Sequence, residues 1–246
     1  MIAIIGGSGL EDPELLKESE EIIIETPFGK HSPIKKGFIE GIEIAILSRH
    51  GYKHEYSPSS IPYKANIFAL KELGAKAIIA TSACGSLREE LVPESISFPS
   101  QFIDRTTKRD SSYTEFGNVI HEGHSDPFDK KLREILVKKS KEIGIEYSAD
   151  TTLITIEGPR FSTRAESEYF RKFDFDLINM TTVPEVCLAK ELKIPYQVIN
   201  LITDYDCWKE NEEAVTFEIV LERMKNNSEK VKKIILKSLK EIDKEF

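Results

Sequence analysis

Short apolar runs that end abruptly in small or polar residues recur along the chain, and stretches of helical period separate them. These runs are residues 2–5, 44–48, 77–80, 151–156, 177–180 and 196–202. Runs of this length predict buried strands, and their alternation with helices predicts an α/β fold. Because α/β proteins place their sites at the carboxyl ends of strands, the residues that follow each run are the candidate functional residues.

The run 196–202 leads into Thr203 and then into two carboxylates, Asp204 and Asp206. On an extended backbone, residues i and i+2 point to the same side. Two neighbouring carboxylates cannot both ionise freely, so one of them can stay protonated near neutral pH and give a proton to a substrate. A polar turn that caps the next helix is the alternative interpretation of this segment.

Groups that suit an anion follow the runs in the first third of the chain. Ser8 stands in a glycine-rich turn after the first run, where backbone N–H groups can approach an anion, although a plain tight turn explains the same residues. Arg49 and His50 follow the second run and suit a phosphate or carboxylate; a surface Arg with a structural His is the alternative. Ser82 follows the third run and adds a hydroxyl donor.

Residues that suit a flat ring lie in the second half of the chain. Phe161 and Ser162 fall between the run 151–156 and a helix whose start is marked by a capping box of Thr163 and Glu166. An exposed aromatic side chain in such a loop can stack on a flat ring. With the acids after 196–202, these residues predict a ligand that carries a phosphate at one end and a nitrogenous ring at the other.

The remaining local patterns predict two helix starts and one loop. Asp126 and Pro127 are typical of a cap and first turn, and Thr182 with Glu185 predicts a second capping box. Residues 102–113 are polar and charged, which indicates an exposed loop between elements.

Composition limits the possible partners. The net charge of −8 argues against nucleic acid, and no run approaches the ~18 apolar residues of a membrane span. The three cysteines, Cys84, Cys187 and Cys207, lie far apart, which indicates reduced thiols in a cytoplasmic protein and no zinc or disulfide pairing. Cys84 is interpreted as a small buried side chain. With no internal repeat or linker, residues 1–246 are expected to form a single α/β domain.

The motifs at the strand ends can be compared with those of known families. They are Gly6-Gly7-Ser8-Gly9, Arg49-His50-Gly51, Ser82-Ala83-Cys84-Gly85-Ser86, Glu157-Gly158-Pro159-Arg160-Phe161-Ser162, Asn179-Met180-Thr181 and Thr203-Asp204-Tyr205-Asp206. Together they resemble the purine nucleoside phosphorylase superfamily, and within it the methylthioadenosine phosphorylase family. The resemblance implies a central mixed β-sheet, partly closed as a barrel and flanked by helices, assembled as a homotrimer or hexamer with shared active sites.

The implied reaction is phosphorolysis of methylthioadenosine to adenine and 5-methylthioribose 1-phosphate, with phosphate as co-substrate and no metal or organic cofactor. The resemblance assigns catalysis at the base to Asp204, as the donor to N7, and to Asp206, as the acceptor from the exocyclic amine. It assigns phosphate binding to Ser8, Arg49, His50, Ser82, Ala83 and Thr181. It assigns substrate binding to Phe161, Ser162, Asn179, Met180 and His121, the last of these reaching over from a neighbouring subunit.

The chain departs from the family pattern in ways that leave alternatives open. Ser8 stands where many relatives have Thr, and the chain ends at Phe246, before a C-terminal helix that covers the 5′ pocket in animal members. Selectivity for the methylthio group therefore stays open. A 6-oxopurine phosphorylase and a non-catalytic nucleoside-binding protein are the other readings. Asp204 speaks against the first, because the oxopurine relatives carry Asn there. The presence of both Arg49-His50 and Asp204 speaks against the second, because a binding protein needs no proton donor at the base.

Overall fold

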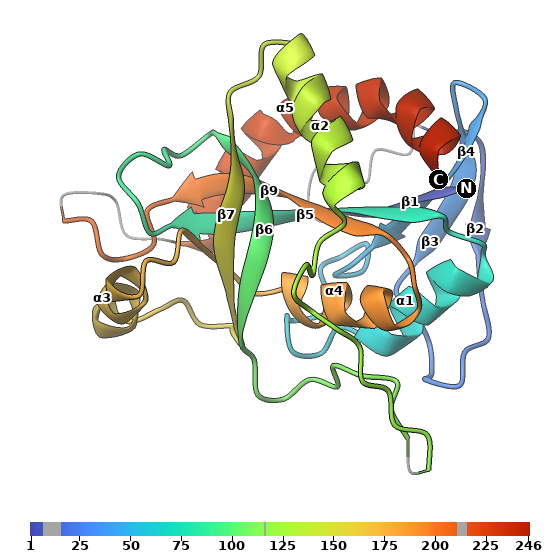
Figure 1. Ribbon diagram of the computed structural model, residues 1–246, viewed down its shortest axis with the longest axis horizontal. Helices are drawn as coiled ribbons and strands as arrows, with labels where there is room; N and C mark the ends of the chain where they lie inside the picture. The colour runs from blue at the N-terminus through green and yellow to red at the C-terminus, as the bar shows by residue number, and fades with distance from the viewer. Residues whose placement is uncertain (7–15, 116, 211–215) are drawn as a thin grey trace.

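One mixed β-sheet organises the chain, and Figure 1 shows it running across the molecule with helices above and below. The computed structural model describes residues 1–6, 16–115, 117–210 and 216–246. The strands of this part are β1 (Ile2–Gly6), β2 (Lys17–Ile22), β3 (Ile34–Ile39), β4 (Ile42–Ser48), β5 (Ala77–Ser86), β6 (Ile96–Arg105), β7 (Tyr147–Ile156), β8 (Leu177–Asn179) and β9 (Tyr196–Asp204). The helices are α1 (Tyr63–Glu72), α2 (Lys130–Glu142), α3 (Arg164–Lys172), α4 (Thr182–Glu191) and α5 (Phe217–Glu245).

Half of the sheet closes into a barrel. The strand order is β2-β3-β4-β1-β5-β8-β7-β6-β9, and a further pairing of β5 with β9 joins β5, β8, β7, β6 and β9 into a ring. β5 and β9 run parallel, with Ser82 opposite Asn200, and β1 runs parallel to both β4 and β5. Because these strands share a direction, the ends of β4, β5 and β9 meet at one side of the sheet. This confirms the mixed, partly closed sheet that the resemblance implied.

The apolar runs are buried because helices cover both faces of the central strands. Every residue of β1 and β9 is buried, as expected for parallel strands covered on two sides. One core cluster packs α1 and α4 against the sheet through residues such as Leu70 and Val186. A second cluster packs α2 and α5 through residues such as Leu136 and Leu239. Figure 1 shows these two helix pairs on opposite sides of the sheet.

Several local expectations are wrong in detail. Residues 102–105 belong to β6 and do not start a loop. Helix α2 begins at Lys130, and Asp129 caps it by accepting the Leu132 N–H at 2.8 Å, so the cap lies later than 126–127. The capping box of Thr163 and Glu166 forms as expected.

The second capping box does not form. Thr181 stands at the N-cap of α4 without a side-chain capping bond, and the Glu185 carboxylate pairs with Arg49 instead.

Strands β5 and β9 extend beyond the apolar runs, so that Ser82 and Asp204 lie within strands and not after them. Their positions are therefore fixed by ladder hydrogen bonds.

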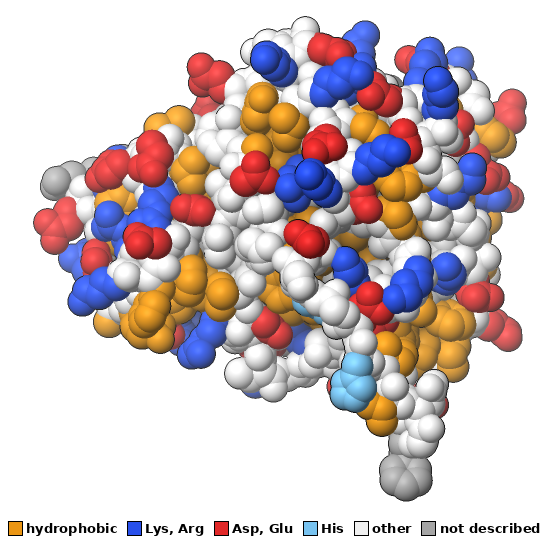
Figure 2. All heavy atoms as spheres, in the orientation of Figure 1, with side chains coloured by type: hydrophobic (Ala, Val, Ile, Leu, Met, Phe, Trp, Pro, Cys, Tyr) orange, Lys and Arg blue, Asp and Glu red, His pale blue; other side chains and the backbone are white. Residues whose placement is uncertain are grey.

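Acidic and basic side chains are mixed over the face that Figure 2 shows, and apolar side chains gather over α3 at its lower left. Tyr169 of α3 is 51% exposed and Phe173, just after it, is 58% exposed. In the part of the chain that the structure describes, no helix has the length and apolar character needed to span a bilayer.

Candidate active site

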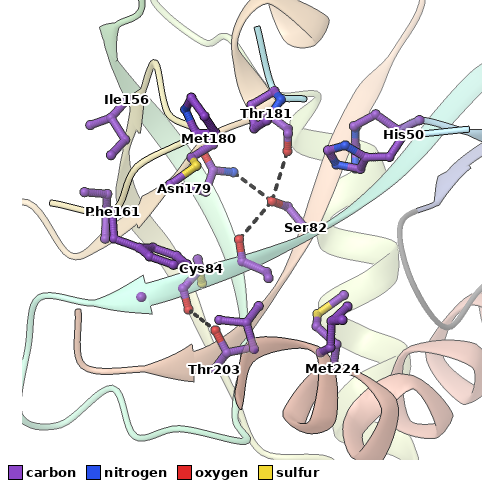
Figure 3. Close-up of a pocket in the computed structure, with 18 of the residues that line it drawn as sticks. His50, Ser82, Cys84, Ile156, Phe161, Asn179, Met180, Thr181, Thr203 and Met224 are labelled. Atoms are coloured by element: carbon purple, nitrogen blue, oxygen red, sulfur yellow. Dashed lines mark hydrogen bonds between the residues drawn. The ribbon is translucent and has the colours of Figure 1, made fainter. Parts of the chain in front are cut away.

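A cavity of about 460 Å³ lies where the ends of β4, β5, β8 and β9 converge (Figure 3). It brings together most of the residues that the sequence singled out: Arg49, His50, Ser82, Ala83, Phe161, Ser162, Asn179, Met180, Thr181, Asp204 and Asp206. His121 is exposed on the connection between β6 and α2 and does not line this cavity. Ser8 lies outside the described residues.

Asp204 forms the acidic end of the cavity and is 8% exposed. Its Oδ1 accepts the backbone N–H of Asp206 at 2.7 Å, and its Oδ2 lies 2.7 Å from the Thr203 hydroxyl. Burial raises the pKa of Asp204 to about 6, while the hydrogen bonds from Thr203 and the Asp206 N–H oppose the rise. Such a group can hold a proton near neutral pH and release it to a bound base.

The two acids do not sit side by side on an extended strand as expected. Asp206 has a positive φ of 52°, and the chain folds back so that its N–H points at Asp204. Burial is the main cause of the raised Asp204 pKa, and repulsion from Asp206 contributes less. Neither acid caps the next helix, because Thr216 occupies the N-cap of α5. The interpretation of the segment as a capping turn is therefore wrong.

Asp206 presents an oxygen for which the described residues provide no partner. Its Oδ2 is buried without a hydrogen bond in this part of the chain, and so are the hydroxyl oxygens of Ser162 and Ser167. Burial raises the pKa of Asp206, and the Ser167 and Ser162 hydroxyls lie close enough to oppose that rise, although neither meets the geometry of a hydrogen bond to the carboxyl group. These unpaired oxygens can serve a ligand that supplies N–H groups.

An aromatic ring and a thioether line the middle of the cavity. Phe161 is 38% exposed, and Figure 3 shows its ring directed toward Cys84 on β5, with Met180 on the neighbouring strand end. Gly158 has a positive φ of 67°, and a Cβ there would lie 2.5 Å from the Met180 sulfur. Glycine at 158 therefore lets the loop after β7 pass close to Met180.

The polar end of the cavity is a cluster of hydroxyl and amide groups around Ser82 (Figure 3). The Ser82 hydroxyl lies 3.2 Å from the Thr181 hydroxyl and accepts the Asn179 amide at 3.0 Å. Asn179 is buried and also bonds Thr182 and Thr155, at 2.6 and 2.8 Å. The Asn179 side chain therefore holds Ser82 in place, and Ser82 in turn contacts Thr181.

Arg49 lines the cavity but its guanidinium already has partners. It pairs with Glu185 through contacts of 2.5 and 2.9 Å and donates to the Thr81 carbonyl at 2.7 Å. Both side chains are almost fully buried, at 2% and 1% exposed. The positive charge of Arg49 is thus largely cancelled inside the protein.

His50 beside it is neutral at ordinary pH. Burial lowers the pKa of His50 to about 4. Its Nδ1 lies 2.8 Å from the Tyr56 carbonyl, and since a carbonyl only accepts, Nδ1 carries the proton. The other ring nitrogen of the neutral imidazole is then an acceptor.

Arg109 is a site-supporting residue that the sequence analysis placed in an exposed loop. Its side chain is 1% exposed and donates to the carbonyls of Met180, Val183 and Glu157 at 2.6, 2.7 and 2.6 Å. It therefore ties the β6–α2 connection to the two loops that carry Phe161 and Met180. Sequence gives no signal for this role, because the partners lie 48 to 74 residues away.

Glu157 contacts the same β6–α2 connection just before Arg109. Burial alone would raise the pKa of Glu157, but the Ser59 hydroxyl and the backbone N–H groups of Thr107 and Lys108 outweigh it and lower the pKa to about 2. Those N–H groups lie 2.6 and 3.1 Å from the carboxylate. The loop before Arg109 is thereby ordered.

Helix α5 closes the cavity with apolar side chains. Val220, Leu221 and Met224 line it, at a spacing that places them on one face of the helix. The helical period of this segment was recognisable, but its contribution to the site was not predicted. In the described part of the chain, no cluster of three or more His, Cys, Asp or Glu side chains could hold a metal ion.

Comparisons with known proteins agree with this arrangement. The family model described as the phosphorylase superfamily matches residues 1–240. S-methyl-5′-thioadenosine phosphorylase of Xenopus tropicalis is 48% identical, over 98% of this chain and 88% of that protein. The protein of that name from Nitrosopumilus maritimus is 45% identical, over 99% and 92%. A methylthioadenosine phosphorylase from Schistosoma mansoni, solved in complex with adenine, matches with a TM-score of 0.95 and 37% identity, over 100% and 92%. The chain belongs to the phosphorylase superfamily and, within it, to the S-methyl-5′-thioadenosine phosphorylase family.

Proposed function

We propose that this protein cleaves S-methyl-5′-thioadenosine with phosphate and releases adenine and 5-methylthioribose 1-phosphate. The observation that carries the proposal is one cavity with a buried acid of pKa about 6 at one end and the hydroxyl cluster of Ser82 and Thr181 at the other. The relatives that carry the name of this activity, and a related structure in complex with methylthioadenosine, support it.

The acidic end suits the leaving adenine. When the bond between C1′ and N9 breaks, its electron pair stays with the base, and the proton of Asp204 goes to N7. The unpaired Oδ2 of Asp206 can accept from the 6-amino group, with the Ser162 hydroxyl as a further polar contact. Phe161 can stack on the purine ring. This set of donors and acceptors fits a 6-aminopurine.

The polar end suits the phosphate that attacks C1′. We assign its binding to the Ser82 and Thr181 hydroxyls and the Ala83 backbone, with Arg49 and His50 beside them. Ser8 is assigned there from the sequence motif alone. A phosphate oxygen forms the new bond to C1′ as the bond to N9 breaks, so the charge on the phosphate can stabilise the cationic sugar. Met180, whose carbonyl is bonded by Arg109, forms the surface for the sugar.

The apolar face of α5 favours an apolar 5′ substituent. Val220, Leu221 and Met224 give the cavity a wall without hydrogen-bonding groups. A 5′-methylthio group gains by burial against such a wall, whereas a 5′-hydroxyl left without a partner costs about 1–3 kcal/mol. The wall therefore supports methylthioadenosine over adenosine.

We further infer that the protein works in the cytoplasm as a homotrimer or a hexamer whose subunits share sites. The shared sites are supported by the connection between β6 and α2, which projects from the body of the fold in Figure 1 and carries the exposed His121. A residue placed there can reach the cavity of a neighbouring copy.

The test is a panel of nucleosides incubated with and without phosphate, with free base and sugar phosphate measured. Methylthioadenosine should release adenine only when phosphate is present, with one equivalent of sugar 1-phosphate. Equal release without phosphate would identify a hydrolase and refute the proposal. A preference for inosine would identify an oxopurine phosphorylase, and binding without turnover would identify a nucleoside-binding protein.

A further inference from the structure

A charged side chain of helix α5, that of Arg223, hydrogen-bonds the strand that carries Asp204. Arg223 donates from its Nη1 to the Thr203 carbonyl at 2.5 Å, directly before Asp204 in β9. The same helix face brings Val220 and Met224 to the cavity. Arg223 thus stands where α5, the cavity and the acidic end meet.

The charged and titratable groups that act on Asp204 come from several elements. Asp206, in the turn after β9, supplies an N–H and a carboxyl group, and Cys84 of β5 supplies a neutral thiol whose pKa burial raises well above its usual value. Glu166 of α3 acts on Asp206. Arg223 of α5 is the cation of this set, and its charge opposes the rise that burial causes in the Asp204 pKa.

We propose that Arg223 is a positioning residue for the acid: it fixes α5 against β9, and its charge stabilises the carboxylate that Asp204 becomes when it gives its proton to the base. The proposal rests on the proposed function, in which Asp204 protonates the leaving adenine. It adds a charged residue of α5 to a site that this helix otherwise lines with apolar side chains.

The indirect contact is what makes Arg223 suitable for this role. An arginine paired directly with Asp204 would lower the acid's pKa by about 1–3 units and leave it ionised, so no proton would be available. Arg223 bonds the backbone carbonyl of Thr203 instead. Its positive charge therefore acts on Asp204 without a direct ion pair between the two side chains. The proton is kept in the resting protein, and the anion is favoured once the proton has left.

The experiment measures the pH profile of kcat/KM for methylthioadenosine and phosphate in R223Q, R223K and R223A. Loss of the cation raises the Asp204 pKa, so the acid stays protonated to higher pH. The alkaline fall in activity should therefore move up by about half a pH unit in R223Q and R223A, and kcat should drop several-fold. R223K keeps the charge and should keep the profile near that of the wild type.

Lys230 provides a matched control. It lies on the same helix and also donates to a backbone carbonyl, that of Glu94 at 2.8 Å, but not beside the acid. K230Q should leave the pH profile unchanged even where it lowers thermal stability. If R223A fails to fold, R223Q and R223K carry the comparison, and the pH dependence of their unfolding midpoints reports on Asp204 without any activity measurement.

An R223Q profile that coincides with that of the wild type would overturn the inference, and it would leave Arg223 with a docking role only. That outcome differs from failure of the proposed function. The latter is judged on the wild-type protein, which would then show no phosphate-dependent release of adenine before any variant is made.

Discussion

Replacing Asp204 by Asn should remove most of the activity and yet make the protein more stable at alkaline pH. The two side chains have nearly the same shape, and Asn can occupy the same network. Its oxygen can accept the Asp206 N–H while its amide faces the Thr203 hydroxyl, which can turn to the Cys84 carbonyl 3.2 Å away. The substitution therefore removes the ionisable proton and little else.

The stability change follows from the raised pKa of Asp204. Its value of about 6 in the folded protein, against an ordinary 3.8, means that the folded state holds this proton more tightly than the unfolded chain does. The contribution of this proton to the free energy of unfolding is present at about pH 4 and below, and it is lost as the pH rises through 6. A shift of about two units corresponds to about 3 kcal/mol at pH 8. For a chain of this length, that is roughly 6–12 °C in the unfolding midpoint.

Thermal unfolding between about pH 4 and 8, paired with kcat for methylthioadenosine, tests the argument. Asp204→Asn should match the wild type near pH 4, exceed its midpoint near pH 8, and lose about 100-fold or more in kcat, because general acid catalysis contributes about that much. Asp129→Asn, at the N-cap of α2, is the matched control, since Asn caps as well as Asp. It should change neither activity nor midpoint.

Two results would refute the reasoning. A lower midpoint for Asp204→Asn at pH 8 would mean that the carboxylate stabilises the turn, and retention of most of the kcat would mean that no proton comes from Asp204. The variant should also gain some activity on inosine, because an amide can donate to a 6-oxo group. An unchanged ratio of adenine to hypoxanthine release would count against the assigned base contacts.

Three further perturbations test other parts of the site. Gly85→Ala should lower kcat about ten-fold with a smaller loss of stability, because its Cβ would lie 2.8 Å from the Asp204 Oδ1 and displace it; kinetics with thermal melts decide this. Glu157→Gln should lower the unfolding midpoint at pH 7 but not near pH 2, since the lowered pKa of Glu157 gives stability that is present above its ordinary value and lost as the pH falls; equal differences at both pH values would contradict it. Mixed oligomers of His121→Ala and Asp204→Ala subunits should recover activity if sites are shared, and no recovery in demonstrably mixed oligomers would reject sharing.

The positions of the site residues were largely predictable because the direction of the strands determines where the strand ends, and the residues on them, lie. Runs such as 2–5 and 196–202 are short and mostly apolar, which is typical of buried strands, and β1 and β9 are indeed fully buried. Once the strands are parallel, their ends must meet, which brings Ser82 and Asp204 to one cavity. Local patterns and one topological rule were enough for this part.

The supporting contacts were not predictable, because they join residues far apart in the chain. Arg49 and Glu185 are separated by 136 residues, and the sequence around Glu185 suggested a capping box. Arg109 stands in a polar stretch that reads as a surface loop, yet it is buried among backbone carbonyls. The competing principle in both cases is that a buried charge needs a partner, wherever the fold provides one.

The balance of charge at the polar end follows from these supporting contacts and bears on the proposed reaction. An arginine without another partner would bind a phosphate dianion firmly. It would also neutralise part of the negative charge of the phosphate, which is the charge that has to stabilise the cationic sugar. Binding of that kind strengthens the ground state as much as the transition state and does not raise kcat. Here Glu185 already cancels most of the Arg49 charge, and His50 is neutral. In the proposed reaction, a phosphate bound at this end by Ser82 and its neighbours would keep most of its negative charge for the sugar, which would favour attack over tight binding.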